Sequence, residues 1–133
     1  MSYETAADAI RARFAANWSG TAFYPNQPFS EPPANSVWAR LSILDTASQQ
    51  RSLGSSGGRL VRRPGLIAVE IYAPKAQGDE ATRQSMDSVR SAFEMTTFSG
   101  ITTREMRVTA RGEQNNWFRT DLFFEFWRDD TGI

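Results

Sequence analysis

Four segments of the chain alternate apolar and polar residues, and this period of two restricts the possible folds more than any other feature. The segments are residues 36–45 (SVWARLSILD), 66–73 (LIAVEIYA), 101–111 (ITTREMRVTAR) and 117–128 (WFRTDLFFEFWR). Successive side chains of a strand point to opposite sides of a sheet, so alternation gives each strand one apolar side. The pattern therefore predicts four strands of one sheet.

Residues 3–18 and 79–95 have the helical period instead. Their apolar stripes consist of Ala7, Ile10, Phe14 and Trp18 in the first segment and Met86, Val89 and Phe93 in the second. Each helix has a single apolar stripe, which it must pack against an apolar surface, and one face of a sheet can serve both helices. We predict an α+β fold with a mixed, mainly antiparallel four-stranded sheet, two helices packed on one face and a long extended β-hairpin arm. A length of 133 residues suits a single domain over residues 1–133.

The residues needed for common enzyme chemistry are scarce. The chain has no cysteine and no histidine, so disulfides, thiolate nucleophiles, the usual zinc sites and the commonest general base are excluded. The glycines of segment 54–58 lie between two strands and lack the lysine of a phosphate-binding loop. The acid pairs Asp79–Glu80 and Asp129–Asp130 have no second chemical partner. We expect no enzyme, no cofactor and no metal.

A basic segment separates the first two predicted strands. No acid occurs between Asp45 and Glu70, whereas four arginines do. A connection of about twenty residues is usually functional or disordered, and we predict that residues 46–65 form a protruding hairpin with its tip at residues 54–58. The alternative is a solvated loop. The arm residues expected to contact a partner are Arg51, Leu53, Arg59, Leu60, Arg62 and Arg63.

One side of the last predicted strand combines aromatic and charged residues. We expect four of them to form an interface with another subunit or a partner, namely Trp117, Arg119, Phe123 and Trp127. Such a mixture is too apolar for solvent and too charged for a second core, and tryptophan and arginine are enriched at interfaces. Alternatively, the proline-rich connector at residues 19–35 covers this side within the monomer.

The chain resembles the tail terminator, or tail completion, proteins of long-tailed bacteriophages. The resemblance covers nearly the whole chain and depends on the order and spacing of its parts, since no single motif is diagnostic. The parts are AADAIRARFAA, FYPNQPFSEPP followed by VWARLSIL, the hairpin SLGSSGGRLVRRPGLIAVEIYAP, ATRQSMDSVRSAF and WFRTDLFFEFW.

This resemblance implies a structural virion protein of the tail, which is present in the host cytoplasm during assembly. Such proteins form a ring, usually a hexamer, that caps the head-proximal end of the tail tube, ends tube polymerisation and provides the head-docking surface. The implied partners are other copies of the chain, the tail tube protein and a head–tail connector or neck protein. Other head–tail joining proteins share similar layouts, so a neck protein is the alternative.

A nucleic-acid-binding module is the alternative from another class. Basic residues beside exposed aromatic residues could follow a phosphate backbone. However, the formal net charge is zero and the isoelectric point is about 6.3, whereas nucleic-acid-binding domains usually carry a basic excess. We expect no specific nucleic acid partner. We also expect no membrane partner, because no apolar run approaches the length of about 20 residues that spans a bilayer.

Overall fold

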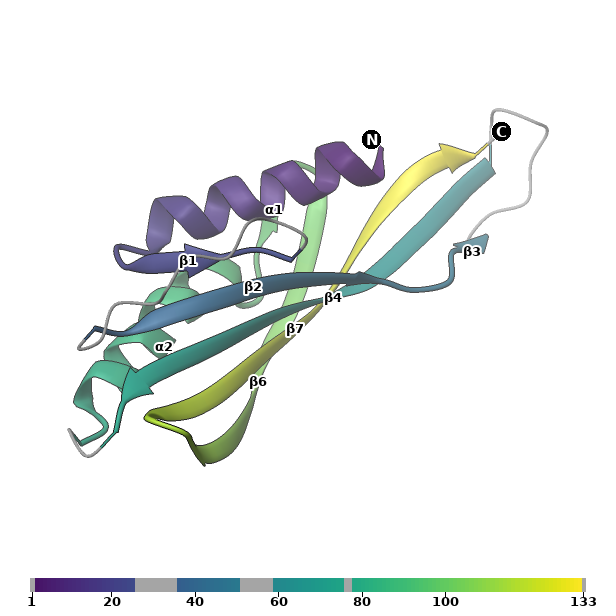
Figure 1. Ribbon diagram of the computed structural model, residues 1–133. Helices are drawn as coiled ribbons and strands as arrows, with labels where there is room; N and C mark the ends of the chain where they lie inside the picture. Colours follow the sequence, from purple (N-terminus) through teal and green to yellow (C-terminus); the bar gives the residue numbers. More distant parts are fainter. Residues whose placement is uncertain (1, 26–35, 51–58, 76–77, 133) are drawn as a thin grey trace.

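The computed structural model describes residues 2–25, 36–50, 59–75 and 78–132, which form two helices and one curved sheet (Figure 1). The helices are α1 (Tyr3–Asn17) and α2 (Glu80–Phe93), and the strands are β1 (Thr21–Phe23), β2 (Trp38–Asp45), β3 (Gln49–Gln50), β4 (Arg59–Pro74), β5 (Thr97–Phe98), β6 (Ile101–Gln114) and β7 (Trp117–Gly132). Six strands lie side by side in the order β1-β2-β4-β7-β6-β5, and β3 pairs with β4 beyond the end of β2.

The prediction of a four-stranded, mainly antiparallel sheet is wrong. The described residues form a mixed half-barrel, in which β1 pairs in parallel with β2 and β5 extends the sheet beyond β6. These added strands have only two or three residues, too few to show an alternating pattern. In addition, β4 and β7 are each 16 residues long and pair along their whole length, well beyond the apolar parts that the sequence pattern identified.

Both helices lie where the helical period predicts them. The side chain of Ser2 caps α1 by accepting a hydrogen bond from the backbone N–H of Thr5 at 3.0 Å. Asp79 occupies the N-cap position of α2, but its carboxylate makes no capping hydrogen bond and instead accepts one from Arg83 at 2.8 Å. Each helix buries one stripe and leaves its other side polar, so both pack on the same side of the sheet.

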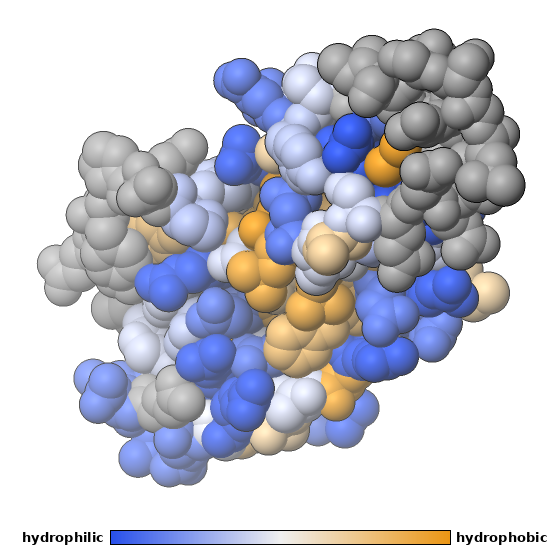
Figure 2. All heavy atoms as spheres, turned by 90° about the vertical axis from the view of Figure 1, so that its right-hand side faces the viewer, coloured by the Kyte–Doolittle hydropathy of each residue, from blue (hydrophilic) through white to orange (hydrophobic). Residues whose placement is uncertain are grey.

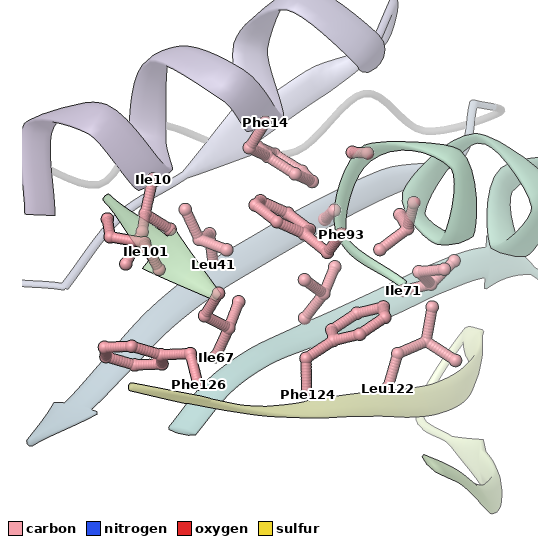
Figure 3. Packing of buried hydrophobic residues seen from close by; sticks show 14 of the residues in the cluster. Ile10, Phe14, Leu41, Ile67, Ile71, Phe93, Ile101, Leu122, Phe124 and Phe126 are labelled. Carbon is pink, nitrogen blue, oxygen red and sulfur yellow. The ribbon is translucent and has the colours of Figure 1, made fainter. Parts of the chain in front are cut away.

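The core fills the space between the helices and the sheet (Figure 3). Phe14 of α1 lies 6.5 Å from Phe93 of α2, measured between ring centroids, and Phe93 lies 5.6 Å from Phe124 of β7. Ile67 and Leu122 complete the contact from the sheet, and both are fully buried. Burying each such side chain contributes about 1.5–3 kcal/mol of stabilisation. The helices therefore leave the opposite side of the sheet uncovered.

Gly65 permits a close contact between β4 and β7. It pairs in register with Phe126, and the aromatic ring lies across the glycine. A Cβ atom at this position would lie 2.4 Å and 2.6 Å from two ring carbons and 2.8 Å from the backbone oxygen of Leu44. Only glycine leaves room for the ring here, at the point where β4 leaves the core.

Candidate functional site

The predicted basic arm is part of the sheet. Residues 59–63 of β4 pair on one side with residues 128–132 of β7, while Arg62 and Val61 pair on the other side with β3. We call this three-stranded extension, made of β3, residues 59–64 and residues 127–132, the arm. In Figure 1 its strands run past the N-terminal end of α1. Among the predicted contact residues, Arg59 and Leu60 lie in β4, whereas Arg51 and Leu53 lie outside the described residues.

The arm's arginines pair with carboxylates from the end of the chain. Arg62 donates two hydrogen bonds to Asp129, from Nε at 2.9 Å and from Nη2 at 3.0 Å. Arg63 donates from Nε to Asp130 at 2.8 Å. The hydrogen bond with Asp129 raises the pKa of Arg62 above its ordinary value. Much of the positive charge predicted for residues 46–65 is therefore compensated within the monomer.

On the side of the sheet away from the helices, the strands carry a mixture of arginines, carboxylates and aromatic rings. We call this side the outer sheet face; it comprises Arg40, Arg62, Pro64, Leu66, Glu70, Tyr72, Arg104, Arg107, Arg111, Trp117, Arg119, Asp121, Phe123, Glu125 and Trp127. The four residues predicted from the last strand all belong to it, and all four are half-buried. The structure thus places them with Arg62, but Arg63 points to the opposite side.

Trp127 lies at the centre of the arm end of the outer sheet face. The guanidinium carbon of Arg62 is 5.1 Å from its ring centroid and that of Arg104 is 4.7 Å away, both within the range of a cation–π contact. A hollow of about 540 Å³ opens beside the ring. It is lined by Thr46, Arg62, Pro64, Gly65, Leu66, Arg104, Glu125, Phe126 and Trp127. Figure 2, which views the molecule from the arm side, shows apolar side chains gathered between hydrophilic ones.

A buried carboxylate organises the middle of the outer sheet face. The side chain of Asp121 is 3% exposed and accepts hydrogen bonds from Arg119 at 2.8 Å and 3.0 Å and from Arg111 at 2.9 Å. Burial alone would raise the pKa of Asp121, but these two guanidinium groups lower it below its ordinary value. Next to them, burial and the hydrogen bond to Glu70 raise the pKa of Tyr72 to about 12. Asp121 is therefore ionised and Tyr72 is neutral near neutral pH.

At the other end of the outer sheet face, aromatic residues cover one another. Trp38 stacks on Tyr72 with ring centroids 4.0 Å apart, and Trp117 meets Trp38 edge-on at 5.8 Å. Phe23 of β1 contacts Trp38 edge-on at 5.3 Å. Trp38 is consequently only 5% exposed. Phe23 of the connector therefore contacts this end of the face within the monomer through Trp38. Residues 26–35 of the connector lie outside the described residues, so the alternative interpretation stays a prediction.

Several residues of these surfaces were not predicted as site residues. Arg104 and Arg107 come from β6, and their side chains reach Glu125 of β7. The pair Asp129–Asp130 was noticed only as a lone acid pair, although it pairs with Arg62 and Arg63 of the arm. The complementary charge of Asp129–Asp130 and the basic segment was the one signal in the sequence that could have indicated this pairing.

Within residues 2–25, 36–50, 59–75 and 78–132, no group of three or more Asp or Glu side chains is arranged to hold a metal ion. Neither described helix combines the length and apolarity that crossing a bilayer requires. Among the described residues, hydrogen-bonded ion pairs and aromatic contacts make up this site. Such groups suit contact with a protein surface.

Comparison with known proteins agrees with this interpretation. The family model described as "Phage tail terminator protein" matches residues 5–120. Eleven chains of known structure are also similar. One of them, whose name states no activity, superimposes on this chain with a TM-score of 0.63 at 16% sequence identity. The superposition covers 92% of this chain and 94% of the other chain. That likeness concerns the fold alone. No curated protein matches the chain.

The family match covers most of the chain and includes α1 from its third residue, the whole of α2 and the first four residues of β7. The chain therefore belongs to the phage tail terminator proteins, a family of structural proteins of the phage tail.

Proposed function

We propose that this protein forms a ring at the head-proximal end of the tail tube, where it ends tube polymerisation and provides the surface to which the head docks. The observation that carries the proposal is the family match over residues 5–120. The partners are other copies of the chain, six in the complete ring, the tail tube protein and a head–tail connector or neck protein. The protein is a component of the virion tail, and it acts in the host cytoplasm during assembly.

The outer sheet face supports a role in protein assembly. Hot spots of protein interfaces are rich in tryptophan and arginine, and they lie in pockets surrounded by polar residues. Trp127, with Arg62 and Arg104 beside it, has this composition. The hollow next to it can accept one or two apolar side chains of a partner. We therefore assign this end of the face, with Trp117, Arg119 and Phe123 farther along, to contacts with ring neighbours or the tube.

The arm supports protein contact more than contact with nucleic acid. A phosphate backbone is bound by arginines whose charge is available. Arg62 and Arg63 instead donate hydrogen bonds to Asp129 and Asp130. A polyanion would have to compete with these two carboxylates. Nucleic acid binding is thus the weaker candidate, and we expect only weak association that disappears with added salt.

Electron microscopy of a phage that lacks this chain tests the proposal. Host cells supply either the wild-type protein or the variant Trp127→Ala, whose folding is checked by thermal melting. Without the protein, we expect tubes longer than wild type that are not joined to heads, and wild-type protein should restore both length and joining. Because Trp127→Ala removes the ring at the centre of the hollow, we expect it to restore neither fully.

Two other outcomes of this experiment would be informative. Tails of normal length that fail to join heads would identify the chain as a neck protein instead of a terminator. Tails of normal length joined to heads, in the absence of the chain, would contradict both assignments.

A further inference from the structure

The net charge of the chain is zero, but the charges are unevenly distributed between its two sides. The outer sheet face carries more arginines than carboxylates. Its arginines are Arg40, Arg62, Arg104, Arg107, Arg111 and Arg119, and its carboxylates are Glu70, Asp121, Glu125 and the adjoining Asp129. Helix α2 and its two flanking residues have the reverse excess. They carry Asp79, Glu80, Asp87 and Glu94 against Arg83 and Arg90. Each copy therefore has a basic sheet face and an acidic helix, α2.

On the outer sheet face, two arginines share one carboxylate. Arg104 Nε lies 3.7 Å from Glu125 Oε2, and Arg107 Nη2 lies 3.4 Å from Glu125 Oε1. Both distances exceed those of a good charge-assisted hydrogen bond, about 2.7–2.9 Å. The arginine side chains are 52% and 62% exposed. One positive charge is left over here, and both guanidinium groups have room for a carboxylate from another molecule.

Helix α2 shows the opposite arrangement, in which two carboxylates share one arginine. Arg90 Nη2 lies 3.5 Å from Asp87 Oδ1, and Arg90 Nη1 lies 4.0 Å from Glu94 Oε1. The side chain of Asp87 is 71% exposed. One negative charge is left over here, and the distances to the shared arginine are again long. Glu94 also accepts a hydrogen bond from the backbone N–H of Met106 at 3.0 Å, so Asp87 is the more available of the two carboxylates.

The two carboxylates on one surface and the two arginines on the other are separated by similar distances. Asp87 and Glu94 are two helical turns apart, which is roughly 10 Å along α2. Arg104 and Arg107 are three residues apart on β6, again roughly 10 Å. Normally such strand residues would point to opposite sides, but an irregularity in register between Thr103 and Met106 lets both reach Glu125.

An apolar side chain accompanies each group. Met95 follows Glu94 directly along the chain. It is 73% exposed, which is more than any other large hydrophobic residue in the described part of the chain. In the arginine group, Arg104 lines the hollow beside Trp127. Methionine is flexible and makes favourable sulfur–aromatic contacts, so it suits a hollow with an indole wall.

We propose that neighbouring copies in the ring meet through these two surfaces: α2 of one copy lies on the outer sheet face of the next, with Asp87 opposite Arg107, Glu94 opposite Arg104, and Met95 in the hollow beside Trp127. This inference rests on the proposed ring. Helix α2 covers the inner side of the sheet, whereas the arginines lie on the outer side. The two surfaces adjoin at the β6 edge, where the backbone N–H of Met95 donates to the carbonyl oxygen of Arg104 at 3.1 Å. They remain distinct surfaces, so each copy can bind one neighbour through each. A contact between two unlike surfaces builds a closed ring when the rotation between copies closes.

Charge exchange between the two surfaces tests the contact. The variants Asp87→Arg and Arg107→Glu each place like charges opposite one another in the next copy. We expect each to raise the concentration at which half of the chains are assembled by about tenfold or more, because like charges across an interface are strongly unfavourable. The double variant restores opposite charges, so its assembly should return toward wild type. Native mass spectrometry across concentration, with and without tail tubes, measures this.

A matched control is Asp8→Arg on α1. The Asp8 side chain is 67% exposed, and its carboxylate lies 3.6 Å from the guanidinium group of Arg11. It should assemble like wild type, and all four variants should melt near the wild-type temperature. Rings that form equally well with Asp87→Arg or Arg107→Glu, or a double variant that fails to recover, would overturn this contact but leave the ring intact. Wild-type protein that stays monomeric even on tubes would overturn the contact and the proposed ring together.

Discussion

The substitution Gly65→Ala adds one methyl group at the point where the arm joins the core. The new Cβ would lie 2.4 Å and 2.6 Å from ring carbons of Phe126 and 2.8 Å from the backbone oxygen of Leu44. The ring cannot turn away into solvent, because Phe126 is 3% exposed and packed in the core. The backbone oxygen cannot move without bending β2. The strain must therefore be shared by β2, β4 and β7.

Overpacking of this kind costs about 1–3 kcal/mol of the free energy of unfolding. For a domain of this length, about 1 kcal/mol corresponds to a change of roughly 3–4 °C in melting temperature. We therefore expect Gly65→Ala to melt about 3–10 °C below wild type when unfolding is followed by circular dichroism or calorimetry.

A double-mutant cycle with Phe126→Leu identifies the cause. Leucine lacks the outer ring carbons that meet the new Cβ, so Gly65→Ala should cost clearly less in the Phe126→Leu background than in wild type. An equal cost in both backgrounds, or a Gly65→Ala variant that melts with wild type, would refute the packing argument.

Three further predictions concern charge. Arg62→Glu with Arg63→Glu should lower the melting temperature, because each new carboxylate faces Asp129 or Asp130. An unchanged melting temperature would show that these pairs do not stabilise the arm. Asp121→Asn should cost about 3 kcal/mol at pH 7. Because the folded-state pKa of Asp121 is lowered, its ionised form stabilises the fold above the unfolded pKa of about 3.9, and this stabilisation is lost as pH falls through the folded-state pKa. The melting temperatures of variant and wild type should therefore converge below about pH 4. A difference in melting temperature that does not depend on pH would contradict this. Fluorescence anisotropy with single- and double-stranded probes should show only weak binding that salt abolishes, and sub-micromolar affinity near physiological salt would instead favour the nucleic acid alternative.

The parts of the fold that the sequence predicted are those with a strong local pattern. The stripe with Ile10 and Phe14 and the N-cap Ser2 define α1, and the alternation around Val69 and Leu122 identifies the inner parts of β4 and β7. The sequence allowed at most a short strand at residues 21–24, where β1 forms, and it did not predict β5, because two or three residues give no clear pattern. Each of these strands pairs with a strand that other contacts hold in place.

The outer half of β4 was hidden for a different reason. Its residues 59–63 include three arginines, so the sequence predicted only one strand of a hairpin over residues 46–65, with a solvated loop as the alternative, and no pairing with β7. What makes it a strand is its pairing with β7, including hydrogen bonds from Arg62 to Asp129 across 67 residues of sequence. Local patterns cannot reveal such a distant partner. Composition led us to expect an interaction surface at Trp117, Arg119, Phe123 and Trp127, and the roles of all four residues remain predictions.

Polymerisation of the purified tail tube protein of the same phage, in the presence of increasing amounts of this chain, tests the central claim most directly. Tube lengths are measured by electron microscopy. If the chain caps growing tubes, mean length should fall as its ratio to tube protein rises, with added density at one end of each tube. Tubes whose length does not depend on the chain, and whose ends carry no added density, would contradict the claim.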